Sequence, residues 1–266
     1  MIKANNIGSG FSHQPCSTFK QTTDKISWNY NSLLYDTTFY CEKAIMHGWR
    51  DRQSRNKFGW LIETPELLQA EIAFCYENHK DLKSIYRHIF THSSLLLALD
   101  PELFKFVPCT GTWIREPKIH EKTKNVSMIT SNKSFTSGHK ARLQFVSKYR
   151  DKFDLFGRGF TPLKDKEEAL CDYRFSVCIE NGIDELFFTE KILDCFATGT
   201  IPIYLGATKI DKFFNIKGIL FIENGEFDFS RLNEELYNEM RPYAIENLEN
   251  CRQFITSEDW MINNYF

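Results

Sequence analysis

The sequence predicts an α/β protein built on parallel sheets. Two observations lead to this prediction, and a third bears on the number of domains. Between residues 125 and 222, short apolar segments alternate with amphipathic segments of helical period, as in repeated βαβ units. Residues 174–179 (RFSVCI) are continuously apolar, as in a parallel strand that is covered on both faces. The length of 266 residues allows two modest domains or one large domain.

The N-terminal half contains weaker signals. The first thirty residues are polar and indicate a loop with one short strand. Residues 57–62 (KFGWLI) predict a buried strand that ends before Pro65, and residues 66–76 have the apolar spacing of a helix. The α/β pattern then continues through three short segments, residues 85–92, 94–99 and 103–107.

Residues 108–124 contain prolines, a glycine and a run of charges, and they predict a linker. We therefore expect an N-terminal domain of residues 1–118 and a C-terminal domain of residues 119–266. In the latter, Thr189 is a good N-cap and Gly199 a good C-terminal stop for a helix of residues 190–198. The other expected elements are strands at 125–130, 153–156, 174–179, 200–205 and 218–222, and helices at 138–150, 165–172 and 232–255.

Composition and charge exclude several classes of function. The 33 Lys and Arg residues are balanced by 35 Asp and Glu, so no basic excess is available to bind nucleic acid by counterion release. No apolar stretch approaches the roughly 20 residues that span a bilayer, and the N-terminus lacks the apolar run of a secretory signal. The eight cysteines form no Cys-x-x-Cys pair. We expect a cytoplasmic protein that binds no nucleic acid.

The segment of residues 174–205 carries the strongest sign of a binding site. A right-handed crossover between two parallel strands places the loop and the helix start between them at the carboxyl edge of the sheet, where open α/β sheets bind ligands. The free N–H groups of a helix start attract anions such as phosphate. Lys191 stands at the second position of this helix and opposes the helix dipole unless an anion compensates it; the alternative is an exposed lysine.

Three more side chains suit a ligand that carries both hydroxyls and phosphates. Glu180 and Asn181 directly follow the apolar strand and can hydrogen-bond sugar hydroxyls, although an Asx-type turn is the alternative. Arg142, in the first turns of the helix expected at 138–150, can grip a diphosphate bidentately. The alternative for Arg142 is a solvated helix face.

The order of these motifs resembles the signature of the α1,3/4-fucosyltransferases, glycosyltransferase family 10. Residues 175–181 (FSVCIEN), 187–191 (FFTEK) and 199–206 (GTIPIYLG) are similar to the family motifs F-x-x-x-x-E-N, Y-x-T-E-K and G-T-x-P-x-x-x-G. The likeness covers about residues 125–222. In the N-terminal half, only residues 60–65 (WLIETP) resemble a family segment.

The resemblance implies a GT-B architecture of two Rossmann-like domains with parallel sheets, the N-terminal one small. It implies an inverting enzyme that moves fucose from GDP-fucose to a hydroxyl of an oligosaccharide or glycolipid acceptor. For an enzyme of this kind in the cytosol, we expect the acceptor to be a bacterial surface glycan such as lipopolysaccharide or capsule. By motif position, Arg142 and Lys191 would contact the donor diphosphate, and Glu190 and Asn181 the donor hydroxyls. The family tyrosine beside T-E-K is Phe187 here, so one donor contact is lost or replaced.

The resemblance also implies a general base in the N-terminal domain. In the family, this base is a glutamate that follows a strand and shortly precedes a proline, which matches Glu63 before Pro65. Glu66 is the other candidate for the base. The alternative for Glu63 is a purely structural role at the entry of a helix.

No metal site and no cofactor besides the co-substrate GDP-fucose are expected, because Arg142 and Lys191 already supply the cations and the sequence contains no Asp-x-Asp pair. A glycolipid acceptor is compatible with peripheral contact with a membrane. Two alternatives remain open: the same fold with another nucleotide-sugar donor, and a non-catalytic module that binds a sugar nucleotide or a carbohydrate.

Overall fold

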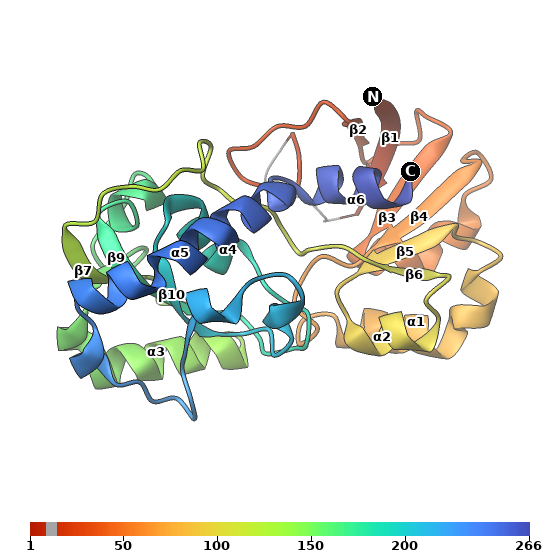
Figure 1. Cartoon of the computed structure of the whole chain (residues 1–266). Coiled ribbons are helices and arrows are strands. Elements are labelled where there is room, and N and C mark those ends of the chain that lie inside the picture. The colour runs from red at the N-terminus through yellow and green to blue at the C-terminus, as the bar shows by residue number, and fades with distance from the viewer. Residues whose placement is uncertain (9–14) are drawn as a thin grey trace. The chain divides into compact units, whose positions relative to one another are not determined.

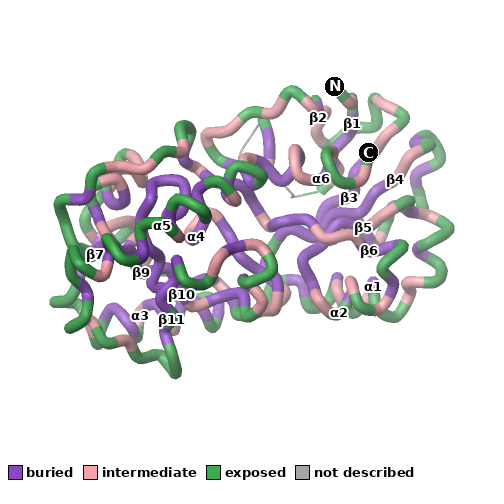
Figure 2. The backbone as a smooth tube through the Cα atoms, in the orientation of Figure 1, coloured by how far each residue is buried: buried purple, intermediate pink, exposed green. Residues whose placement is uncertain are grey.

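The structure is a computed structural model that describes residues 1–8 and 15–266. Its strands are mostly buried, and its exposed residues lie mainly on the surrounding helices and loops (Figure 2). The chain divides into two compact α/β units. The N-terminal unit consists of Met1–Gly111, Asp184–Phe187 and Ile255–Phe266, and the C-terminal unit of Thr112–Ile183 and Phe188–Phe254.

The N-terminal unit is built on a six-stranded parallel sheet with the order β2-β1-β3-β4-β5-β6. Helices α1 and α2 contribute to the apolar core that contains Ile89, and α6 contributes to the core that contains Phe90, so the two cores lie on opposite faces of the sheet. The elements are β1 (Ile2–Ile7), β2 (Ile26–Tyr30), β3 (Thr37–Cys41), the 3₁₀ helix η1 (Glu42–Arg50), β4 (Asn56–Trp60), α1 (Gln69–Leu82), β5 (His88–Thr91), α2 (Ser94–Leu99), β6 (Phe104–Phe106) and α6 (Ser257–Tyr265).

The described part of the first thirty residues contains two strands, β1 and β2, where the sequence predicts a loop with one strand. The difference arises because β1 carries polar side chains into the interior. Asn5 is fully buried; its amide nitrogen donates to the Tyr35 carbonyl and to Thr38 Oγ1, and its oxygen accepts the N–H groups of Leu34 and Tyr35. A buried polar group that is fully hydrogen-bonded is compatible with a core, but apolar periodicity does not reveal it.

The C-terminal unit is built on a five-stranded parallel sheet with the order β11-β10-β9-β7-β8, as the alternating pattern predicts. Thr189 caps the start of α4 by accepting the Lys191 N–H, and Gly199 ends that helix at φ +71°, so both predicted caps are confirmed. The elements are β7 (Lys124–Ile129), α3 (Ser137–Tyr149), β8 (Asp154–Phe156), the 3₁₀ helix η3 (Lys166–Ala169), β9 (Tyr173–Ile179), α4 (Glu190–Thr198), β10 (Ile201–Leu205), β11 (Leu220–Phe221) and α5 (Glu234–Cys251).

Three predicted helices differ from the observed ones. The helix α1 begins at Gln69 instead of residue 66, because a turn closed by the Leu67 N–H on the Thr64 carbonyl comes first. The helix expected at 165–172 is the single 3₁₀ turn η3. The long helix expected at 232–255 is interrupted after α5, and Thr256 begins α6 by accepting the N–H of Asp259.

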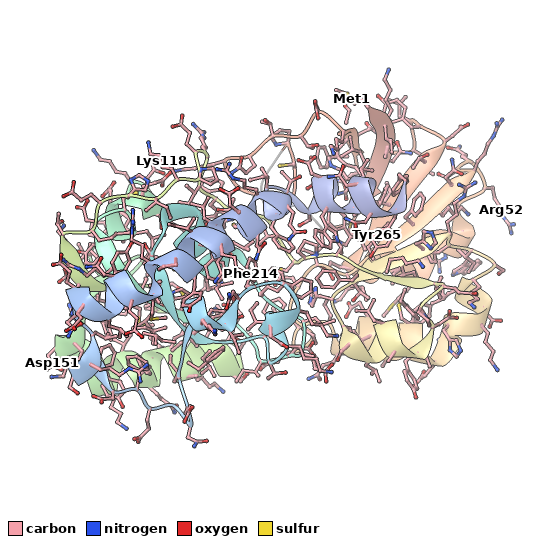
Figure 3. The ribbon with its side chains drawn as sticks, viewed as in Figure 1. Met1, Arg52, Lys118, Asp151, Phe214 and Tyr265 are labelled. Atoms are coloured by element: carbon pink, nitrogen blue, oxygen red, sulfur yellow. The ribbon has the colours of Figure 1, made fainter. Side chains whose placement is uncertain are left out.

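Helix α6 belongs to the N-terminal unit, whereas the sequence places all of residues 119–266 in the C-terminal domain (Figure 1). The buried Glu258 of this helix accepts hydrogen bonds from Ser17 N and Oγ at 2.7 and 2.6 Å and from Trp28 Nε1 at 3.2 Å. Near the chain end, Tyr265, which is labelled in Figure 3, lies on α6. Its hydroxyl donates to the Phe106 carbonyl at 2.9 Å. These partners lie more than 150 residues away in the sequence, so local patterns do not indicate them.

No helix among the described residues has both the length and the apolar character needed to cross a membrane.

Candidate functional site

The loop between β9 and α4 is fixed by one buried carboxylate. Glu180 directly follows β9, and its side chain is inaccessible to solvent. One of its oxygens accepts the Thr189 N–H at 2.9 Å, and the other accepts the Thr189 hydroxyl at 2.7 Å. Glu180 therefore ties the helix start to the strand end, and its oxygens are occupied by protein groups.

Lys191 lies inside this network. Its ammonium donates to Thr189 Oγ1 at 2.9 Å and lies 3.3 Å from Glu180 Oε2 and 3.5 Å from Glu190 Oε1. Only 16% of the side chain is exposed. The alternative of a freely solvated lysine does not describe this arrangement, because two oxygens of the helix start and one from Glu180 at the end of β9 surround the ammonium.

A second lysine, Lys166, lies beside Glu190 and Lys191, and the sequence analysis did not identify it. Lys166 from η3 forms ion pairs with Asp194 at 2.7 Å and with Glu190 at 3.4 Å, and it lies over the Trp113 ring at 3.9 Å from the centroid. Asp194 also accepts the Thr112 hydroxyl and the Trp113 N–H. Lys166 stands in a polar, charged stretch (KDKEE), which carries no signal of a buried ion pair.

Glu190 is ionised under all ordinary conditions. Burial alone would raise its pKa, but the ammonium groups of Lys191 and Lys166 outweigh burial and lower the pKa to about 2. The carboxylate is thus a permanent hydrogen-bond acceptor at the first position of α4.

Arg142 is the least satisfied charge of the site. It is 4% exposed, and among the described residues its Nε has no hydrogen-bond partner. Burial lowers the pKa of the guanidinium, and the charges of Glu180 and Glu190 act in the opposite direction. The same two carboxylates pair with Lys191. Arg142 of α3 and Lys191 of α4 therefore both interact with the same two carboxylates.

Gly138 explains how α3 approaches β9 so closely. A Cβ at this position would overlap the Glu180 carbonyl oxygen and the backbone of Asn181. Only glycine permits this contact between the first turn of α3 and the end of β9. The helix start is further defined by a capping box, in which Thr136 accepts the His139 N–H and His139 Nδ1 accepts the Thr136 N–H.

The structure thus brings together four of the predicted residues, Arg142, Glu180, Glu190 and Lys191, with the half-buried Asn181 next to Glu180 in the chain. Phe187 belongs to the N-terminal unit, where it is buried with its ring 5.0 Å from that of His92. Glu63 also belongs to that unit; it follows β4 and is exposed. Across the described residues, no group of three or more His, Cys, Asp or Glu side chains is arranged to hold a metal ion.

Comparison with known proteins identifies relatives of the C-terminal unit. Residues 119–244 match the model of glycosyltransferase family 10 (fucosyltransferase), C-terminal domain. An α-(1,3)-fucosyltransferase of Helicobacter pylori is 36% identical over 74 residues, which are 28% of this chain and 15% of that protein. A putative fucosyltransferase-like protein of Arabidopsis thaliana is 34% identical over 74 residues, 27% of this chain and 14% of that protein. The matched segment thus spans about one seventh of each relative.

Solved structures extend the similarity of fold to nearly the whole chain. Crystal structures of an α1,3-fucosyltransferase with GDP and with GDP-fucose superpose with a TM-score of 0.50, at 14% and 13% sequence identity. Each match covers 96% of this chain and 81% of the other chain. The two parallel α/β units are thus those of the GT-B fold, and residues 119–244 are similar to the C-terminal domain of glycosyltransferase family 10, the fucosyltransferases.

Proposed function

We propose that the protein transfers fucose from GDP-fucose to a hydroxyl of a glycan acceptor, with inversion at the sugar carbon. In this proposal Arg142 and Lys191 bind the diphosphate, and Glu190 and Asn181 bind hydroxyls of the donor sugar. Glu180 supports the site by holding Thr189 and Lys191, since its oxygens already accept their hydrogen bonds. Glu63 serves as the general base.

One observation carries the proposal: the buried guanidinium of Arg142, whose Nε lacks a hydrogen-bond partner among the described residues. A buried cation without full hydrogen bonding is costly to the fold, and such perturbed charges cluster at functional sites. Its surroundings are the start of α4 and the end of β9. That is the edge where parallel α/β sheets bind nucleotides, and helix starts bind phosphate there.

The proposed reaction needs charge stabilisation at the leaving group and a proton acceptor at the nucleophile. The acceptor oxygen forms a bond to the anomeric carbon while the bond from that carbon to the diphosphate oxygen breaks, and GDP carries away the electron pair. The proton of the acceptor hydroxyl passes to the Glu63 carboxylate. Arg142 and Lys191 face negative charge that grows on the diphosphate, so they stabilise the transition state more than the bound donor.

We propose that this chemistry needs no metal ion, because two side-chain cations serve the diphosphate. We expect a chelator such as EDTA to leave turnover unchanged. A loss of activity that added Mg²⁺ or Mn²⁺ restores would contradict this part of the proposal.

Ligand-induced stabilisation of the intact protein tests the donor class. GDP and GDP-fucose at 100 times their dissociation constant should stabilise the fold by about 2.7 kcal/mol, whereas UDP and CDP sugars should not. Lys191→Ala should weaken the effect of both guanosine ligands. Stabilisation by a different nucleotide sugar would favour that donor, and stabilisation by none of them would contradict a sugar-nucleotide site.

The proposed base is tested by turnover at saturating donor. Glu63→Gln removes the proton acceptor while it preserves size, so kcat should fall by roughly 10²- to 10⁴-fold with GDP binding unchanged. Glu66→Gln, a matched change three residues away, should retain activity. If Glu66→Gln is inactive and Glu63→Gln is active, Glu66 is the base. If both bind GDP and no acceptor yields product with the unaltered protein, a non-catalytic module is favoured.

The acceptor we propose is an oligosaccharide or glycolipid of the lipopolysaccharide type, fucosylated in the cytoplasm at the inner face of a membrane. All eight cysteines are free thiols, which suits a reducing compartment. Incubation with GDP-[¹⁴C]fucose and defined oligosaccharides, with and without a lipid anchor, tests this choice by the radioactivity that the glycan retains.

A further inference from the structure

Three titratable side chains follow three neighbouring strands of the N-terminal sheet. Glu42 directly follows β3, Glu63 comes three residues after β4, and His92 directly follows β5. The three strands are adjacent and parallel, so their carboxyl ends lie at one edge of the sheet. The proposed function uses only Glu63 from this edge.

Glu42 is bonded to the peptide that carries Glu63. Its Oε1 accepts the N–H groups of Ile62 at 3.0 Å and of Glu63 at 3.1 Å. The preceding residue, Leu61, still donates its N–H to the Phe90 carbonyl of β5 at 2.9 Å. The backbone after β4 therefore leaves the sheet ladder at Ile62, and the Glu42 carboxylate accepts the next two N–H groups in place of a strand.

This anchor is costly to the fold in two ways. Glu42 has a backbone φ of +52°, a left-handed conformation that is unfavourable for a residue with a side chain of this size. Its carboxyl group is buried, with the residue 7% exposed, and within residues 1–8 and 15–266 its Oε2 has no hydrogen-bond partner. Strain and unsatisfied polar atoms concentrate at functional sites.

The buried His92 lies near the Glu63 backbone, at the end of β5. Burial lowers the pKa of His92 to about 4, and a hydrogen bond to the Glu63 backbone acts in the opposite direction. The ring is therefore neutral near pH 7, and it packs against Phe187. The Glu63 N–H is thus held by Glu42 at the end of β3, while the Glu63 side chain is exposed.

We infer that Glu42 is a positioning residue: by accepting the N–H groups of Ile62 and Glu63 it holds the Glu63 peptide in the one conformation that presents the Glu63 carboxylate to the acceptor hydroxyl. This inference rests on the proposed role of Glu63 as the base. Glu42 itself contacts neither substrate nor reacting atoms in this account.

Two variants of Glu42 separate anchoring from general stability. Glu42→Gln retains a side-chain carbonyl oxygen at the same reach and can accept both N–H groups. Glu42→Asn is one carbon shorter and loses that reach, but it suits the positive φ better than glutamate, so the protein should still fold. If residue 42 served only the stability of the fold, Glu42→Asn would not lose activity while Glu42→Gln keeps it.

The experiment combines amide exchange of residues 61–66 with steady-state kinetics of the full-length protein. In Glu42→Asn, the Ile62 and Glu63 amides should exchange at least tenfold faster, and kcat should fall at least tenfold while KM for GDP-fucose changes less than twofold. Glu42→Gln should stay within threefold of the unaltered protein in kcat and KM, and its Ile62 and Glu63 amides should exchange no faster than in the unaltered protein. Glu71→Leu, which removes another buried carboxyl of the same unit, should leave kcat unchanged.

Normal amide protection or normal kcat in Glu42→Asn would overturn the inference, and so would an equal loss in Glu71→Leu. The proposed function fails separately, if the unaltered protein neither binds GDP-fucose nor transfers fucose. The amide exchange of Glu42→Asn remains readable in that case and reports on the anchor alone.

Discussion

At the scale of one residue, the buried charge of Arg142 suits ligand binding but lowers the stability of the folded protein. Burial lowers the pKa of its guanidinium, and its Nε has no hydrogen-bond partner among the described residues. An apolar side chain of similar length would avoid this cost. We therefore expect the fold to tolerate the loss of this charge, whereas the proposed diphosphate site requires it.

Arg142→Met should weaken GDP binding by about 2–3 kcal/mol, because charged hydrogen bonds to phosphate are lost. The melting temperature of the ligand-free protein should stay the same or rise. Calorimetric titration with GDP and thermal unfolding without ligand measure the two effects. Lys140→Met, an exposed change on the same helix, is the control and should alter neither quantity. A large loss of stability in Arg142→Met would show that the charge serves the fold.

Glu42 makes the free energy of unfolding depend on pH between about 4.5 and 7. Burial is the main cause that raises its pKa from 4.5 to about 7, and the bonds from Ile62 and Glu63 lower it. The folded protein therefore binds a proton that the unfolded chain has released between these values. The contribution of Glu42 to the free energy of unfolding thus decreases as pH rises from about 4.5 to 7.

Glu42→Gln removes this titration. The variant should be more stable than the unaltered protein at pH 8, by up to about 3 kcal/mol, and the difference should shrink toward pH 5. Urea unfolding at both pH values measures it, and comparison at equal pH cancels the other titrating groups. An equal difference at pH 5 and pH 8 would show that Glu42 titrates normally.

At the scale of single elements, the contact of α3 with β9 determines whether the site forms. Gly138 has a helical conformation, so alanine would favour the helix itself by about 1 kcal/mol. Against this, its Cβ would overlap the Glu180 carbonyl and the Asn181 backbone. Neither backbone can shift without moving the loop that holds Lys191.

Gly138→Ala should therefore destabilise the protein by about 1–3 kcal/mol. The same variant should weaken GDP binding, because the overlap moves the loop that holds Lys191. Gly225→Ala is the matched control: it also changes a glycine of the C-terminal unit, but nothing lies within 4 Å of the added Cβ. That variant should lose only the cost of a positive φ and should bind GDP normally. Chemical denaturation and calorimetry test both, and normal GDP binding by Gly138→Ala would contradict the packing argument.

At the scale of the whole molecule, the N-terminal unit depends on the end of the chain. Helix α6 supplies Met261 to the apolar core beside Phe39 and Phe90, and its Glu258 holds Ser17 and Trp28. Deletion of residues 255–266 should therefore loosen β1 to β6 and cost at least about 3 kcal/mol of apolar burial.

Amide exchange tests this deletion element by element. The amides of β3 and β4 should lose protection, while those of β9 and β10 should exchange as in the full-length protein, because their unit ends at Phe254. A uniform loss of protection through both units would show that α6 stabilises the whole chain instead.

The sequence predicts those features that are set by residues close together in the chain, and it fails for those that depend on distant partners. The apolar runs of β9 and β10, the caps of α4 and the order of the E-N and T-E-K motifs are readable within about 30 residues, and they suffice for the C-terminal sheet and for the neighbourhood of Glu180 and Lys191. Three other features are not readable in this way: the buried Asn5 of β1, the ion pair of Lys166 and the anchoring by Glu42. Each depends on partners outside its own stretch of sequence.

The sequence by itself determined the parallel α/β class, the strand-loop-helix unit with its caps and the family resemblance, because hydrophobic period, capping residues and motif order act over short stretches. Only the tertiary structure decided that Arg142 is buried beside Glu180 and Glu190, that Glu42 holds the Glu63 peptide and that α6 belongs to the N-terminal unit. The physical reason is that burial, and the hydrogen bonds a charge keeps or lacks, are set by neighbours that only folding brings together.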